Sequence, residues 1–209
     1  MDGSNLIVVR DGIPFVLVPL ALAIAPLAFG YWWMALVFLA LAAFMVYFFR
    51  DPKRTPPTEP GIIVAPADGR VTLIKQSGED NPNLLVSIFL SPLDVHINRS
   101  PISGTITDIS YTQGKFLSAT SDKASLLNEQ NSLVIRGENL TVVCKQIAGV
   151  LARRIVCWKH EHDTVSIGER FGMIKFGSRT DLIVNAPVEV LVKEGMRVRG
   201  GVTPIARTL

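Results

Sequence analysis

The sequence predicts a mainly β protein, with a sandwich or barrel-like domain preceded by an apolar helical hairpin. Two observations lead to this prediction. Residues 13–49 contain no charged residue and no histidine. After residue 61, short runs rich in β-branched residues alternate with Gly, Pro, Asn and Asp. At 209 residues the chain has room for one ordinary domain and an accessory element.

The apolar stretch is long enough for two helices. Gly30, followed by Tyr31, Trp32 and Trp33, divides it into residues 13–29 and 31–49. At ~1.5 Å per residue, each half roughly crosses the ~30 Å hydrocarbon core of a bilayer. We therefore expect residues 1–49 to form a membrane-anchoring hairpin whose two ends lie on the same side.

Basic residues flank the hairpin on both sides: Arg10 before it, and Arg50, Lys53 and Arg54 after it. The positive-inside tendency then puts both flanks, and the rest of the protein, on the cytoplasmic side of the cell membrane. A cleaved signal peptide is disfavoured because its apolar region should span only ~7–15 residues behind a cationic start. A shallow re-entrant anchor stays open, because prolines weaken the first half as a regular helix. These prolines are Pro14, Pro19 and Pro26.

The charge balance favours a membrane surface over nucleic acid as a partner, and the two cysteines are expected to be reduced. A net charge of +3 suits an anionic membrane surface. No basic run with interleaved aromatic residues occurs outside the flank of the hairpin, so we expect no nucleic-acid partner. Cys144 and Cys157 lie in different apolar stretches, and a cytoplasmic location keeps thiols reduced. We expect both to be small buried hydrophobic residues.

Residues 50–61 mix charged residues with prolines, which predicts a linker, and residues 62–209 then form the globular domain. Ten short runs separated by turn residues predict a sandwich or barrel. The predicted strands are 61–64, 70–75, 84–89, 105–110, 132–136, 140–147, 154–158, 172–176, 181–184 and 188–192. Only residues 122–129 favour a short helix.

A Gly-Ser step, Gly177-Ser178, lies between two of these strands. Taken alone it is an ordinary turn pair. It is preceded by other distinctive segments in a fixed order: Phe48–Arg54, Ala65–Gly69, Phe89–His96 and Asn128–Asn131. Together with Phe176-Gly177-Ser178 they resemble the phosphatidylserine decarboxylase proenzymes, particularly the short bacterial and archaeal branch. The resemblance spans most of residues 48–184.

The resemblance implies that the chain cuts itself between Gly177 and Ser178, into a large β chain (1–177) and a small α chain (178–209). Ser178 would become a covalent pyruvoyl cofactor, which forms a Schiff base with the amine of phosphatidylserine and yields phosphatidylethanolamine. Membrane lipid and the protein's own two chains would be its partners, with a homodimer left open. Glycine before the serine fits this chemistry, because it leaves the attacked carbonyl open.

Three further site residues follow from the resemblance. His96 corresponds to a functional histidine of the family, and imidazole titrates near neutrality as acid-base chemistry requires. Asp68 matches the acidic partner that would orient it, as in an Asp-His-nucleophile relay. Longer members have a second histidine where this chain has Arg99, whose planar guanidinium could instead bind the phosphate or carboxylate of the substrate.

Other interpretations remain at this stage. His160 and His162 lie in a polar stretch that favours a solvated turn, and we expect no metal site there. Two Gly-turn segments, Ile167–Phe171 and Glu194–Val198, are also typical of the barrel-sandwich domains that hold lipoyl or biotinyl groups. A membrane-tethered carrier or adaptor domain modified at Lys123 is therefore one alternative. A pyruvoyl enzyme for another serine-headgroup lipid, or for a soluble amino acid, is another.

Overall fold

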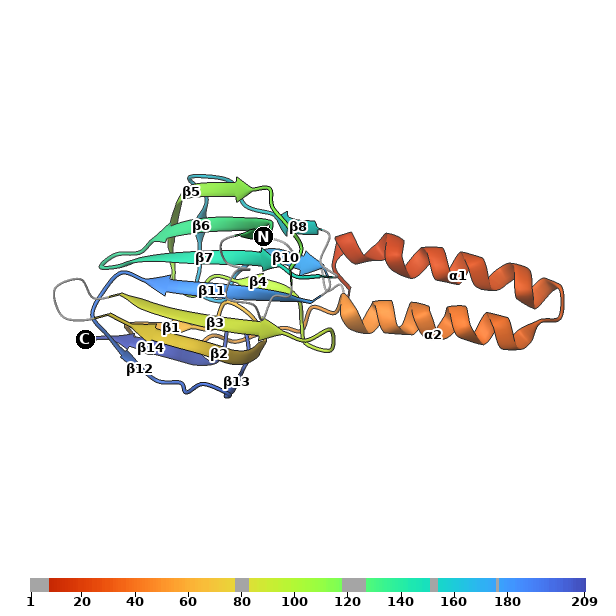
Figure 1. Cartoon of the computed structure of the whole chain (residues 1–209), viewed down its shortest axis with the longest axis horizontal. Coiled ribbons are helices and arrows are strands. Elements are labelled where there is room, and N and C mark those ends of the chain that lie inside the picture. Colours follow the sequence, from red (N-terminus) through yellow and green to blue (C-terminus); the bar gives the residue numbers. More distant parts are fainter. Residues whose placement is uncertain (1–7, 78–82, 118–126, 151–153, 176) are drawn as a thin grey trace. The chain divides into compact units, whose positions relative to one another are not determined.

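The computed structural model describes residues 8–77, 83–117, 127–150, 154–175 and 177–209 (Figure 1). The chain divides into two compact units, Met1–Lys53 and Arg54–Leu209.

The first unit is a pair of apolar helices. A short 3-10 turn, Arg10–Gly12, leads into α1 (Ile13–Ala28), and α2 (Trp32–Phe48) returns antiparallel to it. The hairpin prediction is thereby confirmed. The prolines do not interrupt α1, which passes through Pro19 and Pro26 while Pro14 lies in its first turn. Each internal proline removes one backbone hydrogen bond, a loss that membrane helices tolerate, so α1 stays continuous; shallow insertion stays an open alternative.

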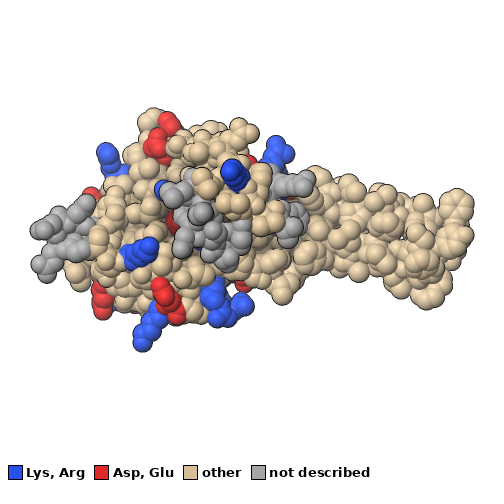
Figure 2. All heavy atoms as spheres, viewed as in Figure 1, with Lys and Arg blue, Asp and Glu red and all other residues tan. Residues whose placement is uncertain are grey.

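Small residues form the contact between the two helices. The buried positions within them include Pro19, Ala23, Ala35 and Ala42, which allow close approach of the backbones. Residues 10–28, a 19-residue apolar segment, are long enough to cross a membrane by length and composition. Helix α2 is shorter, at 17 residues. Figure 2 shows no charged side chain on the visible face of the helices, whereas Lys, Arg, Asp and Glu are scattered over the β unit.

The second unit contains three antiparallel sheets. The largest has eight strands in the order β13-β2-β3-β11-β7-β6-β5-β9. These are β2 (Gly69–Gln76), β3 (Leu84–Leu90), β5 (Gly104–Thr112), β6 (Gln130–Arg136), β7 (Thr141–Ala148), β9 (Thr164–Val165), β11 (Ser178–Val184) and β13 (Arg197–Val198). Register shifts in β2 and β5 act as bulges, which increase twist and help the sheet to curl into a half-barrel.

Two three-stranded sheets complete this unit. One has the order β1-β14-β12, from β1 (Ile62–Val64), β14 (Pro204–Thr208) and β12 (Val188–Val190). The other has the order β4-β10-β8, from β4 (Ile97–Arg99), β10 (Arg170–Lys175) and β8 (Arg154–Cys157). The mainly β prediction is confirmed.

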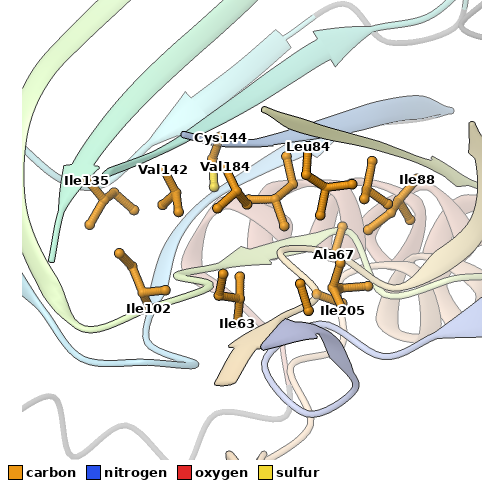
Figure 3. Packing of buried hydrophobic residues seen from close by; sticks show 14 of the residues in the cluster. Ile63, Ala67, Leu84, Ile88, Ile102, Ile135, Val142, Cys144, Val184 and Ile205 are labelled. Carbon is orange, nitrogen blue, oxygen red and sulfur yellow. The ribbon is translucent and has the colours of Figure 1, made fainter. Parts of the chain in front are cut away.

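The hydrophobic core lies between the inner face of the eight-stranded sheet and the sheet of β1, β14 and β12. Alternate residues of β3, β7 and β11 point inward, as the two-residue period of a strand requires. Figure 3 shows Leu84, Val142, Cys144 and Val184 from these strands facing Ile63 and Ile205. This packing accounts for the apolar alternation that the sequence shows.

Some sequence expectations need correction. All ten predicted strands exist, but β4, β9, β13 and β14 were not predicted, because each is short or has little apolar alternation. Residues 118–126 lie outside the described part of the chain, so the helix expected at 122–129 is largely not described. Both cysteines are free, and burial raises the pKa of the Cys144 thiol, but Cys157 is only half-buried.

Candidate active site

The turn between β10 and β11 places Gly177 and Ser178 at one end of the eight-stranded sheet (Figure 1). Strand β10 ends at Lys175, and Phe176 lies outside the described residues. Gly177 has a φ of +55°, in the left-handed region that side chains disfavour. A Cβ added there would meet no described atom within 4 Å. The backbone conformation, and not crowding, therefore makes glycine the suitable residue at this turn.

Ser178 is the first residue of β11, which is an inner strand of the eight-stranded sheet, and it has no exposed surface. Its register partners are Leu90 on β3 and Ala148 on β7. The side chain is 0% exposed, and its Oγ has no hydrogen-bond partner among the described residues. Leaving a buried hydroxyl unpaired costs about 1–3 kcal/mol, so such a group in a native protein calls for a functional explanation.

Ser178 shares its face of β11 with a cluster of buried polar side chains. Thr180 follows it by two residues and therefore points to the same side. The Nδ2 of Asn98, on β4, lies 3.0 Å from the Thr180 Oγ1 and donates to it. Both side chains are fully buried. The apolar interior of the half-barrel thus becomes polar at the end where the Gly-Ser turn lies.

The strand register indicates where His96 points. His96 precedes Asn98 by two residues and therefore shares its face of the chain. The Ile174 amide donates to the His96 carbonyl, and β10 runs from there towards the turn. His96 thus lies on the turn side of Asn98, just as Ser178 lies on the turn side of Thr180. His96 and Ser178 therefore lie on the same side of the contact between Asn98 and Thr180.

A backbone carbonyl orients the imidazole of His96. The ring is 1% exposed, and its Nδ1 lies 2.9 Å from the Asp94 carbonyl oxygen. A carbonyl can only accept, so this contact puts the ring hydrogen on Nδ1 and leaves Nε2 as the basic nitrogen. The Asp94 carboxylate fixes the same loop, because the Ser91 amide donates to its Oδ2 at 2.8 Å. Arg197 forms an ion pair with it at 3.3 Å.

Asp68, the predicted partner of His96, has its two carboxylate oxygens bound elsewhere. The Arg54 guanidinium donates to Oδ2 at 2.7 Å, and the Gly200 amide donates to Oδ1 at 2.8 Å. The orienting contact at Nδ1 of His96 comes instead from the Asp94 carbonyl. Asp68 directly precedes Gly69, the first residue of β2. Strand β3 lies between β2 and β11, so Gly69 and Ser178 are separated by about two strand spacings of ~4.8 Å each. These contacts do not describe a direct relay from Asp68 to His96.

Arg99 belongs to the opposite face of β4 from Asn98, since it follows Asn98 directly. Its Nη1 donates to the Gly168 carbonyl at 3.0 Å, and its side chain is packed against Gly201. The residue is only 8% exposed. The structure therefore does not bring Arg99 to the Gly-Ser turn, and its contact with substrate stays a prediction.

The remaining candidate residues lie apart from this turn. His160 is exposed and lies 3.8 Å from Asp163 in a polar turn, as expected. Within the described residues, no group of three or more His, Cys, Asp or Glu side chains could hold a metal ion. Lys123, the attachment residue of the carrier hypothesis, lies outside the described part of the chain.

Sequence reasoning missed several residues of the site: Asp94, Asn98 and Thr180. Asn98 and Thr180 each follow a predicted site residue by two positions, which is a signal that strand periodicity could have supplied. The role of the Asp94 carbonyl has no signal in the sequence, because every residue has a carbonyl group. The described turn offers a buried hydroxyl next to a glycine in the left-handed conformation, and His96, immediately before β4, has an oriented imidazole.

Comparison with known proteins shows what this chain is similar to. The family model for phosphatidylserine decarboxylase matches residues 41–206. A phosphatidylserine decarboxylase proenzyme of Symbiobacterium thermophilum is 46% identical over 99% of this chain and 98% of its own length. One of Granulibacter bethesdensis is 45% identical over 92% and 82%, respectively. One of Syntrophus aciditrophicus is 42% identical over 95% and 96%.

Proposed function

The chain belongs to the phosphatidylserine decarboxylase family, and we propose that it is a precursor that cuts itself between Gly177 and Ser178 and then decarboxylates phosphatidylserine through a pyruvoyl group made from that serine. It is an enzyme of the decarboxylase class, and phosphatidylethanolamine is its product. The observation that supports self-cleavage most directly is the buried, unpartnered Ser178 Oγ beside the left-handed glycine.

Self-cleavage uses groups that the chain itself supplies. Nε2 of His96 accepts the hydroxyl proton as the Ser178 Oγ attacks the Gly177 carbonyl carbon. The bond from that carbon to the Ser178 nitrogen breaks as the proton passes to the nitrogen, and the amide becomes an ester. The neutral His96 then takes the Ser178 Cα proton, which expels the Gly177 carboxylate and leaves dehydroalanine. Addition of one water releases ammonia and gives a pyruvoyl terminus. The products are residues 1–177 and a blocked fragment beginning at position 178.

The site fits such a group without added ligands, because the pyruvoyl atoms come from residue 178 itself. When present, it supplies a ketone that takes up the substrate amine and a neighbouring amide carbonyl that accepts the electrons released with CO₂. His96 would then hold the proton that the product carbon needs after CO₂ leaves. Asp68 lies about two strands away and is bound by Arg54 and Gly200, so it would act on the site only indirectly.

Intact-mass analysis of the purified chain tests the cleavage. Wild-type protein should give two fragments, the smaller one beginning with a blocked residue at position 178. Ser178→Ala should stay a single chain near 22.8 kDa and release no CO₂ from phosphatidylserine. Ser87→Ala is a matched control, because Ser87 is also buried on the neighbouring strand β3, and it should be cut normally.

The outcomes separate the competing functions. An intact wild-type chain that still decarboxylates the lipid would refute the pyruvoyl mechanism. An intact chain with a modified Lys123 would support the carrier hypothesis instead. A cut chain that acts only on another serine-headgroup lipid or on a soluble amino acid would leave the chemistry in place and change the substrate.

The apolar N-terminal helix α1 indicates membrane association, and the flanking basic residues favour the cytoplasmic side for the β unit. A cysteine at Tyr31, which is 55% exposed between α1 and α2, tests this topology. If the hairpin crosses the bilayer, a membrane-impermeant maleimide should label Tyr31→Cys from outside intact cells. Leu209→Cys, 88% exposed in the β unit, should be labelled only after the cells are opened. Wild-type protein controls for its native thiols.

A further inference from the structure

A chain of four polar side chains crosses the apolar interior of the β unit. The Asn131 amide donates to the Gln146 Oε1 at 2.9 Å, and the Gln146 amide donates to the Asn98 Oδ1 at 2.9 Å. The Asn98 amide in turn donates to the Thr180 Oγ1 at 3.0 Å. Asn131 is 3% exposed, and the other three side chains are fully buried. Four buried polar groups need a strong reason, because their desolvation offsets most of what their hydrogen bonds contribute.

The chain of hydrogen bonds connects two different sheets. Asn131, Gln146 and Thr180 lie side by side on β6, β7 and β11 of the eight-stranded sheet. Asn98 belongs to β4, which pairs with β10 in a separate sheet. Gly172 of β10 lies directly on this cluster, since a Cβ there would come within 3.1 Å of the Gln146 Nε2. The amide of Asn98 therefore bonds the strand that leads from His96 to the strand that begins at Ser178.

Self-cleavage removes one of the connections between the sheet of β4 and β10 and strand β11. Before the cut, residues 176–177 join β10 covalently to β11. After it, β11 begins with a new chain end, while His96 remains on the side of β4 and β10. Strand β11 keeps its backbone pairing with β3 and β7, but that pairing does not fix its distance from β4. Side-chain contacts between the two sheets then maintain the geometry of the site, and the bond from Asn98 to Thr180 joins β4 directly to β11.

We propose that Asn98 and Thr180 are positioning residues that keep His96 opposite position 178 after the chain is cut, with Gln146 and Asn131 fixing the direction of the Asn98 amide. The inference rests on the proposed function and deepens it. Because Gln146 donates to the Asn98 Oδ1, the amide must present its Nδ2 to Thr180. Both positioning residues matter more to lipid decarboxylation than to self-cleavage, which still has the covalent connection.

The expected effect follows from the loss of one buried hydrogen bond and the movement it permits. Thr180→Val keeps the shape of the side chain but leaves the Asn98 amide without its acceptor. We expect kcat for decarboxylation, per mole of cut protein, to fall on the order of tenfold, or about 100-fold if His96 shifts by 1 Å. The rate of self-cleavage should stay within roughly threefold of wild type, and KM should change less than kcat.

The experiment compares three variants with the wild type at equal amounts of cut protein. Thr180→Ser restores the hydroxyl and should recover most of the lost kcat. Asn98→Ala should reproduce the effect of Thr180→Val. Thr107→Val is the matched control. Thr107 lies on β5, and its hydroxyl is 3.4 Å from the Val134 carbonyl on β6, so removal of the hydroxyl should change neither rate. Self-cleavage is followed by gel and decarboxylation by CO₂ release from phosphatidylserine vesicles.

Each outcome decides the proposal. Loss of kcat with normal cleavage, rescued by Thr180→Ser, supports it. Wild-type kcat in Thr180→Val overturns it, and so does an equal loss of cleavage and decarboxylation, because either result denies a special role after the cut. Should Asn98→Ala fail to fold, the isosteric Thr180→Val still decides. If the proposed function is wrong, the wild type itself will not be cut or will not release CO₂ from phosphatidylserine. If only this inference is wrong, the wild type will do both, and the ratio of kcat between variant and wild type will show the failure.

Discussion

Replacing Gly177 with alanine tests whether the left-handed turn at the cleavage site is needed for self-cleavage. The φ of Gly177 is +55°, and the position of the missing Cβ is empty of described atoms to 4 Å. Steric clash with the described surroundings therefore adds nothing to the cost. What remains is the intrinsic penalty of the left-handed conformation for an L-residue, about 1–2 kcal/mol.

That penalty converts directly into a rate. If cleavage proceeds from the left-handed turn, Gly177→Ala populates it less, and cleavage should slow by roughly 5- to 30-fold at about 1.4 kcal/mol per tenfold. Asparagine tolerates the left-handed region better than alanine, so the cleavage rate of Gly177→Asn should lie between those of the wild type and Gly177→Ala. The assay is the disappearance of the uncut chain with time after a pulse of synthesis, followed by gel and intact mass.

A glycine remote from the site provides the control. Gly195 has a φ of +84° in the turn between β12 and β13, and a Cβ there also meets nothing within 4 Å. Gly195→Ala should lower stability by a similar amount and leave cleavage at the wild-type rate. Cleavage of Gly177→Ala within twofold of wild type would refute the argument, as would equal slowing in Gly195→Ala, which would point to global stability instead.

The structure supports three further predictions. Asp181→Asn should lower the free energy of unfolding by about 3–5 kcal/mol, because it removes a buried negative charge 2.9 Å from the guanidinium of Arg179, whose side chain is 8% exposed. A change below 1 kcal/mol in denaturant titration would contradict this. Arg99→Ala should lower Tm, because the buried Gly168 carbonyl loses its donor, with little change in KM, whereas a raised KM at unchanged Tm would support the predicted substrate contact. Burial alone would raise the pKa of Glu169, but its hydrogen bonds and ion pair with Lys159 hold the pKa below the ordinary value of about 4.5. The resulting stability is present above that value and lost as pH falls below it, so Glu169→Gln should show a flatter loss of Tm in acid than wild type; identical curves would contradict the assignment.

Local patterns in the sequence were sufficient for much of the architecture. An uncharged apolar stretch divided by Gly30 predicted the two helices, and ten β-branched runs predicted ten strands. Both signals depend only on neighbours along the chain, since burial of one face imposes a period on residues close in sequence. Strands such as β4 escaped prediction because three residues with a single aliphatic side chain show no period.

The candidate site was predicted in part. Gly177 and Ser178 were predicted through the resemblance, and the structure puts His96 immediately before β4, beside the contact between Asn98 and Thr180. The partners of these residues were not predicted. Asp68 was expected to match the acidic partner of the family, and Arg99 stands where longer members have a second histidine, but the structure bonds them to Arg54 and Gly168.

The sequence by itself determined the order of the elements, the apolar hairpin and the Gly-Ser step where the chain is expected to be cut. Only the tertiary structure decided which groups meet near that step: the backbone carbonyl of Asp94 contacts His96, and the side chain of Asn98 contacts that of Thr180. The reason is geometric. Strand alternation reveals which residues share a face, but the element that a face contacts depends on how separate sheets pack. That packing is decided by the buried core as a whole, through residues far apart in the chain.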